Sequence, residues 1–253
     1  MVTKTITKLS KFEGKPLVET QEVFANFLIG DFGKAALKEY KGRVRAEYDK
    51  NKALNVLYFR DNVVKGSKPY AAVLMNQVLG EEGIRVATPA DLQRILDTEA
   101  LDWRGTYEDA ALVLRSEAEP NSYLARNLTK QIRERNGNER MPVIIPLVGL
   151  ELERDSDAPD GLAFKLKEDA EIIYAPILNK KGNFSSRDVD RKTGLPKELG
   201  NGERYQFVID SGLSRLTLYW IKRLAADWGD LKASGVDGRI VGFRDEATPY
   251  KNN

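Results

Sequence analysis

The chain has 253 residues, 42% of them hydrophobic, which is enough for the core of one large or two ordinary domains. With 40 Lys and Arg against 38 Asp and Glu, its net charge of +2 gives no global attraction to nucleic acid or to a membrane surface. The absence of Cys and His excludes thiol nucleophiles, disulfides, Cys/His zinc sites and Ser-His-Asp triads.

Helical patterns dominate the first part of the sequence. A short Lys-flanked strand is expected over residues 3–12, and helical spacing of apolar residues follows over 18–30 and 32–48. The apolar run 53–60 predicts a buried strand. The pattern over 68–80 predicts a helix that ends at its glycine.

Capping signals mark two further helices. Thr88 is the expected N-cap of the first, with Pro89 at its first position and Asp91 at its third. A strand is expected over residues 109–115. Asn121 is then the expected N-cap of a basic helix.

Short strand-like runs replace the helical patterns from residue 141 onward. These runs are PVIIPLVGLELER, GLAFKLK, EIIYAPIL, YQFVID and GRIVGFR, with a long polar loop between residues 179 and 204. The order of helices and strands predicts an α+β fold. We divide it into a helix-rich N-terminal part, residues 1–80, and a second part, residues 81–253.

Three groups of oxygen-bearing side chains have the residue types that bind calcium. They are Glu119, Pro120 and Asn121, a tripeptide found in some lectins; Asp155, Asp157 and Asp160; and Asp188 and Asp190. The tripeptide directly precedes a helical pattern, and neither acidic cluster has the spacing of an EF-hand loop. Helix capping and solvated turns are therefore the favoured interpretations, and we expect no metal and no cofactor.

The segment GLSRLTLYWIKRLAADWGDLKASGVDG, residues 212–238, contains two of the three Trp residues. Its apolar residues recur every three or four positions, which favours an amphipathic core helix. At a spacing of two, the leucines point to one side and the residues between them to the other, which predicts short strands with one exposed face. The pattern alone favours the helix.

The fixed residues of this segment are similar to those of a known family. SGLSRLTL and GRIV, followed by RDEATPYKNN, resemble the C-terminal variable region of target proteins of diversity-generating retroelements. The resemblance extends upstream through FSSRDVDRKTGLP and GNGERYQFVIDSG and, more weakly, back to residue 109. In that family a reverse transcriptase miscopies template adenines, so selected codons near the 3′ end of the gene become variable.

The resemblance implies a C-type lectin-like fold for residues 81–253, with helices, small antiparallel sheets and a variable region at about residues 211–242. It favours displayed strands over a helix in this region. The positions where the family varies are Thr217, Tyr219, Trp220, Ile221, Arg223, Ala225, Asp227, Trp228, Asp230, Ala233, Gly235 and Asp237. The positions of its scaffold are Leu213, Arg215, Leu216, Leu218, Leu224, Leu231, Ser234, Gly238 and Arg239, whereas Lys222 and residues 240–243 depart from the usual pattern.

The function that the resemblance implies is non-enzymatic binding by a hypervariable surface. The ligand would be a protein or another cell-surface molecule. No apolar run approaches the roughly 20 residues of a membrane span, and the N-terminus lacks the apolar core of a signal peptide. We therefore expect a cytoplasmic protein as encoded, with surface display only through another component.

Two alternatives stay open at this stage. The basic helix 121–136 carries Arg126, Lys130, Arg133 and Arg135, and a nucleic-acid-associated protein would use them to contact phosphates. In that case, the segment after residue 212 would be an ordinary core helix. A hydrolase that depends on carboxylates such as Asp188 and Asp190 is the second alternative.

Overall fold

A computed structural model of the chain describes residues 24–137, 140–219 and 223–244. Its helices are α1 Gly30–Glu47, α2 Pro69–Gly80, α3 Pro89–Thr98 and α4 Ser122–Asn136, with 3-10 turns η1 Leu147–Gly149 and η2 Pro176–Asn179. Its strands are β1 Phe24–Phe27, β2 Tyr58–Arg60, β3 Val63–Lys65, β4 Arg85–Val86, β5 Tyr107–Leu114, β6 Val143–Pro146, β7 Leu150–Arg154, β8 Leu162–Leu166, β9 Ile173–Tyr174, β10 Gly182–Phe184, β11 Arg204–Val208, β12 Leu213–Tyr219, β13 Arg223–Trp228 and β14 Val241–Arg244. The predicted α+β class is confirmed.

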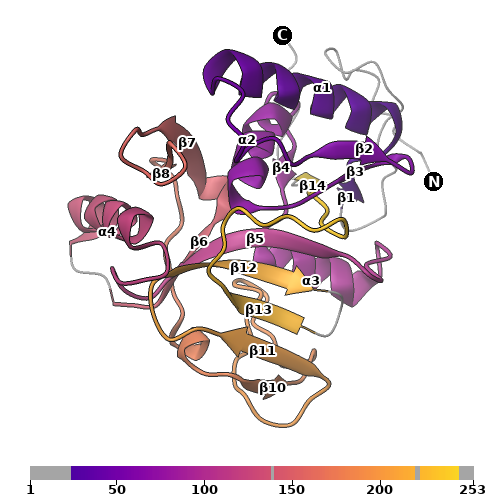
Figure 1. The fold of residues 1–253 in the computed structure, drawn as a ribbon. Helices are drawn as coiled ribbons and strands as arrows, with labels where there is room; N and C mark the ends of the chain where they lie inside the picture. Colours follow the sequence, from indigo (N-terminus) through magenta and orange to yellow (C-terminus); the bar gives the residue numbers. More distant parts are fainter. Residues whose placement is uncertain (1–23, 138–139, 220–222, 245–253) are drawn as a thin grey trace.

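The largest sheet has seven strands in the order β10-β11-β13-β12-β5-β6-β9. All of its neighbouring pairs are antiparallel except β11 and β13, which run parallel. A second sheet, β1-β14-β4, brings the two ends of the described chain together, since Phe24 lies opposite Arg244. Figure 1 shows α1 and α2 above the large sheet, while β13, β11 and β10 extend beyond these helices.

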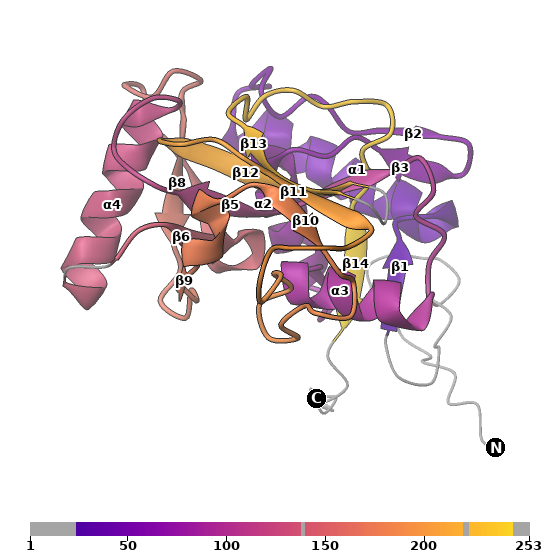
Figure 2. The same cartoon turned by 90° about the horizontal axis from the view of Figure 1, so that it is seen from below.

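Two hydrophobic clusters hold these layers together. In the first, side chains of α1 and α2 pack with Leu112 and Leu114 of β5 and with Leu213 of β12. In the second, Leu92 and Ile95 of α3 pack against the opposite face of the sheet; Figure 2, seen from below, shows α3 beside the strands of the large sheet. Residues before and after position 80 share the first cluster, so the predicted boundary at the end of α2 does not separate two cores.

The helices with clear local signals lie where the sequence predicts them. The expected helices over 32–48 and 68–80 correspond to α1 and α2. At the start of α3, the Thr88 hydroxyl accepts a bond from the Asp91 backbone N–H at 3.3 Å, and the Asp91 carboxylate accepts one from the Thr88 N–H at 2.8 Å. This reciprocal capping satisfies two N–H groups that a helix terminus otherwise leaves without partners.

Four expectations from local patterns are wrong in whole or in part. Residues 24–27 form a strand paired with β14 instead of continuing a helix. The expected strand over 53–60 is confined to Tyr58–Arg60, and the long polar loop contains β10. The segment after residue 212 forms β12 and β13, so its helical periodicity is misleading; the expected strand over 3–12 lies outside the described residues.

Asn121 immediately precedes α4 as expected, but its side chain does not cap the helix. The amide nitrogen instead donates to the carbonyls of Leu213 and Gly229, at 2.7 and 2.6 Å. The backbone of Asn121 is left-handed, with φ of 63°. This residue therefore fixes the start of β12 and the end of β13 against the start of α4.

Two replacements of Asn121 separate the effect of its side-chain hydrogen bonds from that of its left-handed backbone. Asn121→Gly removes both bonds but tolerates a positive φ, so we expect a loss of about 1–3 kcal/mol in the free energy of unfolding. Asn121→Ala adds strain in the left-handed region and should lose about 1–2 kcal/mol more. Urea unfolding measures both, with Lys130→Ala on the exposed face of α4 as the control. A glycine variant as stable as the wild type would contradict this role.

Candidate functional site

The segment predicted to carry the site lies at the centre of the large sheet. Strand register places two rows of side chains across β5, β12, β13 and β11, and directly opposed residues point to the same face. The first row is Tyr107, Tyr219, Arg223 and Tyr205. The second row is Asp109, Thr217, Ala225 and Phe207. This face is on the side of α1 and α2, which do not extend over β13 and β11 (Figure 1).

The structure describes ten of the twelve predicted variable positions; Trp220 and Ile221 lie outside the described residues. Six of the ten are exposed: Arg223, Trp228, Asp230, Ala233, Gly235 and Asp237. Tyr219 and Asp227 are half-buried, and Thr217 and Ala225 are buried. Seven of the nine scaffold positions are buried, with Ser234 and Arg239 half-buried.

Thr217 and Ala225 correct the expectation of display at all these positions. They lie opposite each other in the middle of the second row, with relative exposures of 0% and 6%. The Thr217 hydroxyl donates to Asp109 at 2.8 Å, so a different side chain there would leave that buried carboxylate short of a donor. These two residues are therefore the buried part of this side of the sheet, beneath the exposed side chains.

A buried ion pair lies beneath the exposed residues. The Arg215 guanidinium is 3.4 Å from the Asp109 carboxylate, and the two residues are 2% and 0% exposed. Arg215 also donates to the carbonyl of Ala233 at 2.8 Å. Burial raises the pKa of Asp109, while Arg215 and the hydroxyl of Thr217 oppose that rise. A buried charge is tolerated only with partners of this kind, so the pair constrains both β12 and the segment after β13.

Aromatic rings cover this ion pair. The rings of Tyr107 and Tyr219 stack with centroids 5.8 Å apart, and Trp228 meets each of them edge-on, at 5.9 and 6.4 Å. The Arg215 guanidinium lies 4.4 Å from the centroid of the Trp228 ring. Trp228 is therefore fixed from below by a cation–π contact while 36% of its surface stays exposed.

The loop 229–238, which follows β13, is anchored at several points. The Tyr107 hydroxyl accepts a bond from the Gly235 N–H at 2.6 Å, and the Ser234 hydroxyl accepts one from the Ser67 N–H at 3.1 Å. Lys68 donates to the carbonyl of Lys232 at 3.1 Å, and burial lowers the pKa of Lys68 to about 8. These bonds order the backbone while four of the loop's predicted variable residues face solvent.

Exposed hydrophobic side chains gather in the same segment. In the described part of the chain, the large hydrophobic residues that are more than a third exposed are Ile29, Tyr174, Trp228 and Val236. Two of these four lie between residues 228 and 236, and Val236 is 65% exposed. Trp228 and Val236 are thus exposed apolar groups of the segment predicted to carry the site.

Strand β11 adds two aromatic residues that the sequence interpretation missed. Tyr205 and Phe207 are half-buried on the aromatic side, and their ring centroids are 4.5 Å apart. Arg204 and Gln206, which alternate with them along the strand, point inward and are 2% and 0% exposed. Alternation in YQFVID predicts a two-faced strand, but hydrophobicity alone assigns the aromatic side chains to the interior.

Hydrogen bonds explain this inverted arrangement. Arg204 donates to the side chain of Gln93 at 2.7 Å, and Gln206 donates to the carbonyls of Ile177 and Lys180 at 2.9 and 2.7 Å. Fully burying a Phe side chain is worth about 1.5–3 kcal/mol, and the strand forgoes part of that stabilisation. We define the aromatic face as Tyr205, Phe207, Tyr219, Arg223 and Trp228.

The candidate calcium ligands have other roles in the structure. Asp155 accepts a bond from the Tyr123 hydroxyl at 2.7 Å, and Asp160 pairs with Lys232 at 2.8 Å. Asp190 caps its own turn through the N–H groups of Lys192 and Thr193. Over the described ranges, no three acidic side chains gather in a way that could hold a metal ion.

The basic side chains of α4 lie close to acceptors. Arg133 pairs with Glu117 at 2.9 Å and Lys130 lies 3.9 Å from Glu134. Arg135 donates to the carbonyls of Lys167 and Glu168. Local carboxylates and carbonyls thus compete with any phosphate for this helix.

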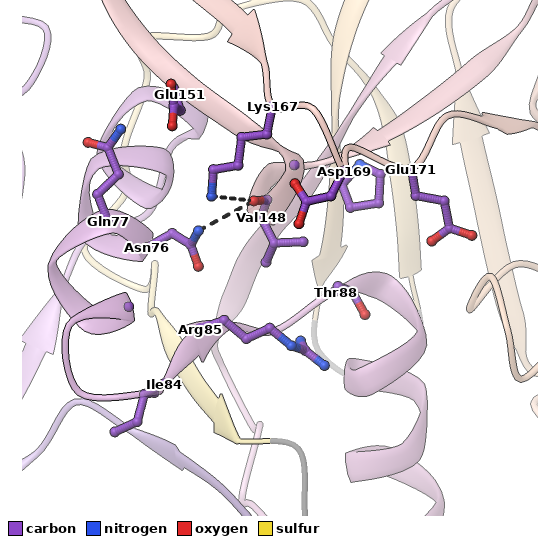
Figure 3. A pocket seen from close by; sticks show the side chains of 13 residues that line it. Asn76, Gln77, Ile84, Arg85, Thr88, Val148, Glu151, Lys167, Asp169 and Glu171 are labelled. Carbon is purple, nitrogen blue, oxygen red and sulfur yellow. Dashed lines mark hydrogen bonds between the residues drawn. The ribbon is translucent and has the colours of Figure 1, made fainter. Parts of the chain in front are cut away.

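A cavity of about 590 Å³ lies away from the aromatic face, between α2, β4, η1 and the segment after β8. Figure 3 shows Lys167 directed at the carbonyl of Val148, to which it donates at 2.8 Å. Asn76 accepts a bond from the Val86 N–H at 2.9 Å, and Arg85 pairs with Asp91. The nitrogen groups of Asn76, Arg85 and Lys167 are therefore engaged within the protein, and none of the twelve predicted positions lines the cavity.

Comparisons of this chain with known protein families, with curated proteins and with solved structures find no match. The structure adds one finding on membranes. Among the helices of the described residues, none is both long and apolar enough to span a bilayer.

A buried carboxyl on the other side of β5 gives a test of this sheet. Glu108 is 1% exposed; one of its oxygens accepts a bond from the Val241 N–H at 2.8 Å, and the other has no partner among the described residues. Burial raises the pKa of Glu108 well above its ordinary value, and Asp109 and Asp91 raise it further. The folded state therefore favours the protonated form.

We expect Glu108→Gln to stabilise the protein increasingly as pH rises. When a carboxyl has a higher pKa in the folded than in the unfolded state, the free energy of unfolding of the protein falls as pH rises above the unfolded pKa of about 4.3. The slope is up to about 1.4 kcal/mol per pH unit. The neutral amide keeps the bond to Val241 and lacks this loss. Urea unfolding at about pH 5 and about pH 8 measures the difference. Glu134→Gln, on an exposed face, is the control, and a difference between Glu108→Gln and wild type that stays constant with pH would contradict the prediction.

Proposed function

We propose that this chain is a non-enzymatic binding protein, the variable protein of a diversity-generating retroelement with a C-type lectin-like fold. The observation that carries the proposal is the aromatic face with its adjoining loop 229–238. Predicted variable residues are exposed there, on a backbone that buried scaffold residues fix. The antiparallel pairing of β12 with β5 and β13 supports the fold assignment.

The two sets of positions fit different physical demands. Exposed side chains outside special contacts change stability by about 0.5 kcal/mol or less, so they tolerate replacement. Buried Leu216, Leu218 and Leu224 pack in the cluster with α3, where replacement costs stability. Variation confined to the first set would alter binding and preserve the fold.

The exposed residues have the chemistry of a binding surface. Trp228 and Tyr219 offer large, rigid contact area, and Arg223, Asp230 and Asp237 offer directional polar contacts, much as antibody loops do. The carbonyl of Ala233 and the N–H of Gly235 are already bonded within the protein, which fixes the loop before binding. Such preorganisation reduces the entropy lost on association.

The stability of matched variants tests whether the exposed predicted variable positions tolerate replacement while the buried ones do not. We expect Ala233→Ser and Asp237→Asn to change the free energy of unfolding by about 0.5 kcal/mol or less. Ala225→Leu, a predicted variable position that the structure buries, should lose about 1–3 kcal/mol through overpacking. Thermal and urea unfolding measure all three. Equal effects at the three positions would argue against this division.

The DNA around the gene tests the retroelement directly. We expect a near-copy of the codons for residues 211–242 close to the gene, with mismatches confined to template adenines and a reverse-transcriptase gene nearby. The codons of buried Thr217 and exposed Trp228 can then each be compared with their counterparts in the near-copy. A unique 3′ end without a second copy would remove the proposal.

A further inference from the structure

The face predicted from the variable positions continues beyond them onto β11. In the first row, Arg223 lies between Tyr219 of β12 and Tyr205 of β11. In the second row, Phe207 lies beside buried Ala225, and the Arg223 guanidinium is 5.6 Å from the centroid of the Phe207 ring. Tyr205 and Phe207 are thus continuous with the exposed residues of β13, although neither is a predicted variable position.

Among the described residues, these two aromatic side chains lie outside both hydrophobic clusters. Neither belongs to the two hydrophobic clusters or to the partly buried residues packed against them, whereas Val208 on the same strand does. Inward hydrogen bonds of Arg204 and Gln206 fix the register that turns them outward. The strand therefore carries two half-buried aromatic rings on the face away from α3, outside both clusters of the described part of the chain.

The charge on this face is positive. Arg223 is exposed and has no ion-pair partner among the described residues, and its contact there is the ring of Phe207. The other charged residue of the two rows is Asp109, which is buried and paired with Arg215. A guanidinium between aromatic rings complements a carboxylate whose neighbours are apolar.

We propose that Tyr205 and Phe207 form the fixed part of the binding site, and that the occupant is a peptide segment with an Asp or Glu side chain flanked by apolar residues. This inference rests on the proposed function and deepens it. The aromatic pair would contact the apolar residues of the segment, and Arg223 would bind its carboxylate in a bidentate manner. Arg223 is a predicted variable position, so the acidic preference belongs to this variant, whereas the aromatic pair would serve every variant.

Selection of a phage-displayed library of random linear peptides on the full-length chain tests the inference. We expect enriched peptides to contain Asp or Glu next to apolar residues. Phe207→Ala and Arg223→Gln should each weaken their binding by about tenfold or more, the effect of a central interface residue. Tyr174→Ala is the matched control, since Tyr174 is an aromatic residue of β9, 46% exposed at the far edge of the same sheet.

A double-mutant cycle identifies the charge contact. Changing the peptide's acid to its amide should weaken binding to the wild type but have little further effect on Arg223→Gln. Added salt should reduce the affinity of the acidic peptide more than that of the amide. Circular dichroism and thermal unfolding establish that each variant is folded, and Tyr205→Ala repeats the test at a second position of the pair.

The remaining outcomes separate this inference from the proposed function. Peptides that lose binding with Trp228→Ala but not with Phe207→Ala and Tyr205→Ala would overturn the role of β11 and leave the displayed site standing. Peptides that bind all of these variants like wild type would contradict both. A selection that enriches no peptide, or peptides without acidic residues, would overturn the assigned occupant, as would binding of neutral glycans in a parallel array.

Discussion

The buried contact between Arg215 and Asp109 is the constraint on which the proposed binding surface depends. It joins β12 to β5 inside the protein, and the same guanidinium bonds to the carbonyl of Ala233 and lies under Trp228. Loss of either charge would leave the other buried without compensation, which typically costs about 3–5 kcal/mol. The sheet, the loop 229–238 and the exposed indole are therefore positioned by one side chain.

This arrangement allows the backbone of the loop 229–238 to stay fixed while exposed side chains on it are replaced. The loop is held through several backbone groups, since the carbonyls of Lys232 and Ala233 accept bonds and the Gly235 N–H donates one. One predicted variable side chain also holds it, because the Asp230 carboxylate accepts bonds from the N–H groups of Lys232 and Ala233. Backbone bonds do not depend on which side chain a position carries, so replacements at Ala233 or Asp237 leave them in place. A surface built in this way keeps its shape while its chemistry changes, which is what diversification of a binding site requires.

Local signals predict the helices, and long-range pairing decides the strands that the sequence misassigns. The Thr88 capping box and the apolar spacing of α1 and α2 act over a few residues, so they can be read from the chain directly. The helical interpretation of residues 24–27 fails because their partner, β14, lies more than two hundred residues away. In the segment after residue 212, leucines fit both periodicities, and only the resemblance favours strands. Thr217 shows the limit of that reasoning, since its buried acceptor, Asp109, belongs to another strand.

The aromatic residues of β11 show why part of the site escapes prediction from sequence. A strand reading Arg-Tyr-Gln-Phe has two possible orientations, and hydrophobicity favours the one that buries Tyr205 and Phe207. The observed orientation is stabilised by distant acceptors, Gln93 on α3 and the carbonyl of Ile177 in η2, which no local pattern identifies. Buried polar groups need partners, and in the observed orientation these acceptors bind Arg204 and Gln206. The interior hydrogen bonds thus fix which face of β11 carries Tyr205 and Phe207, the pair that we propose as part of the binding site.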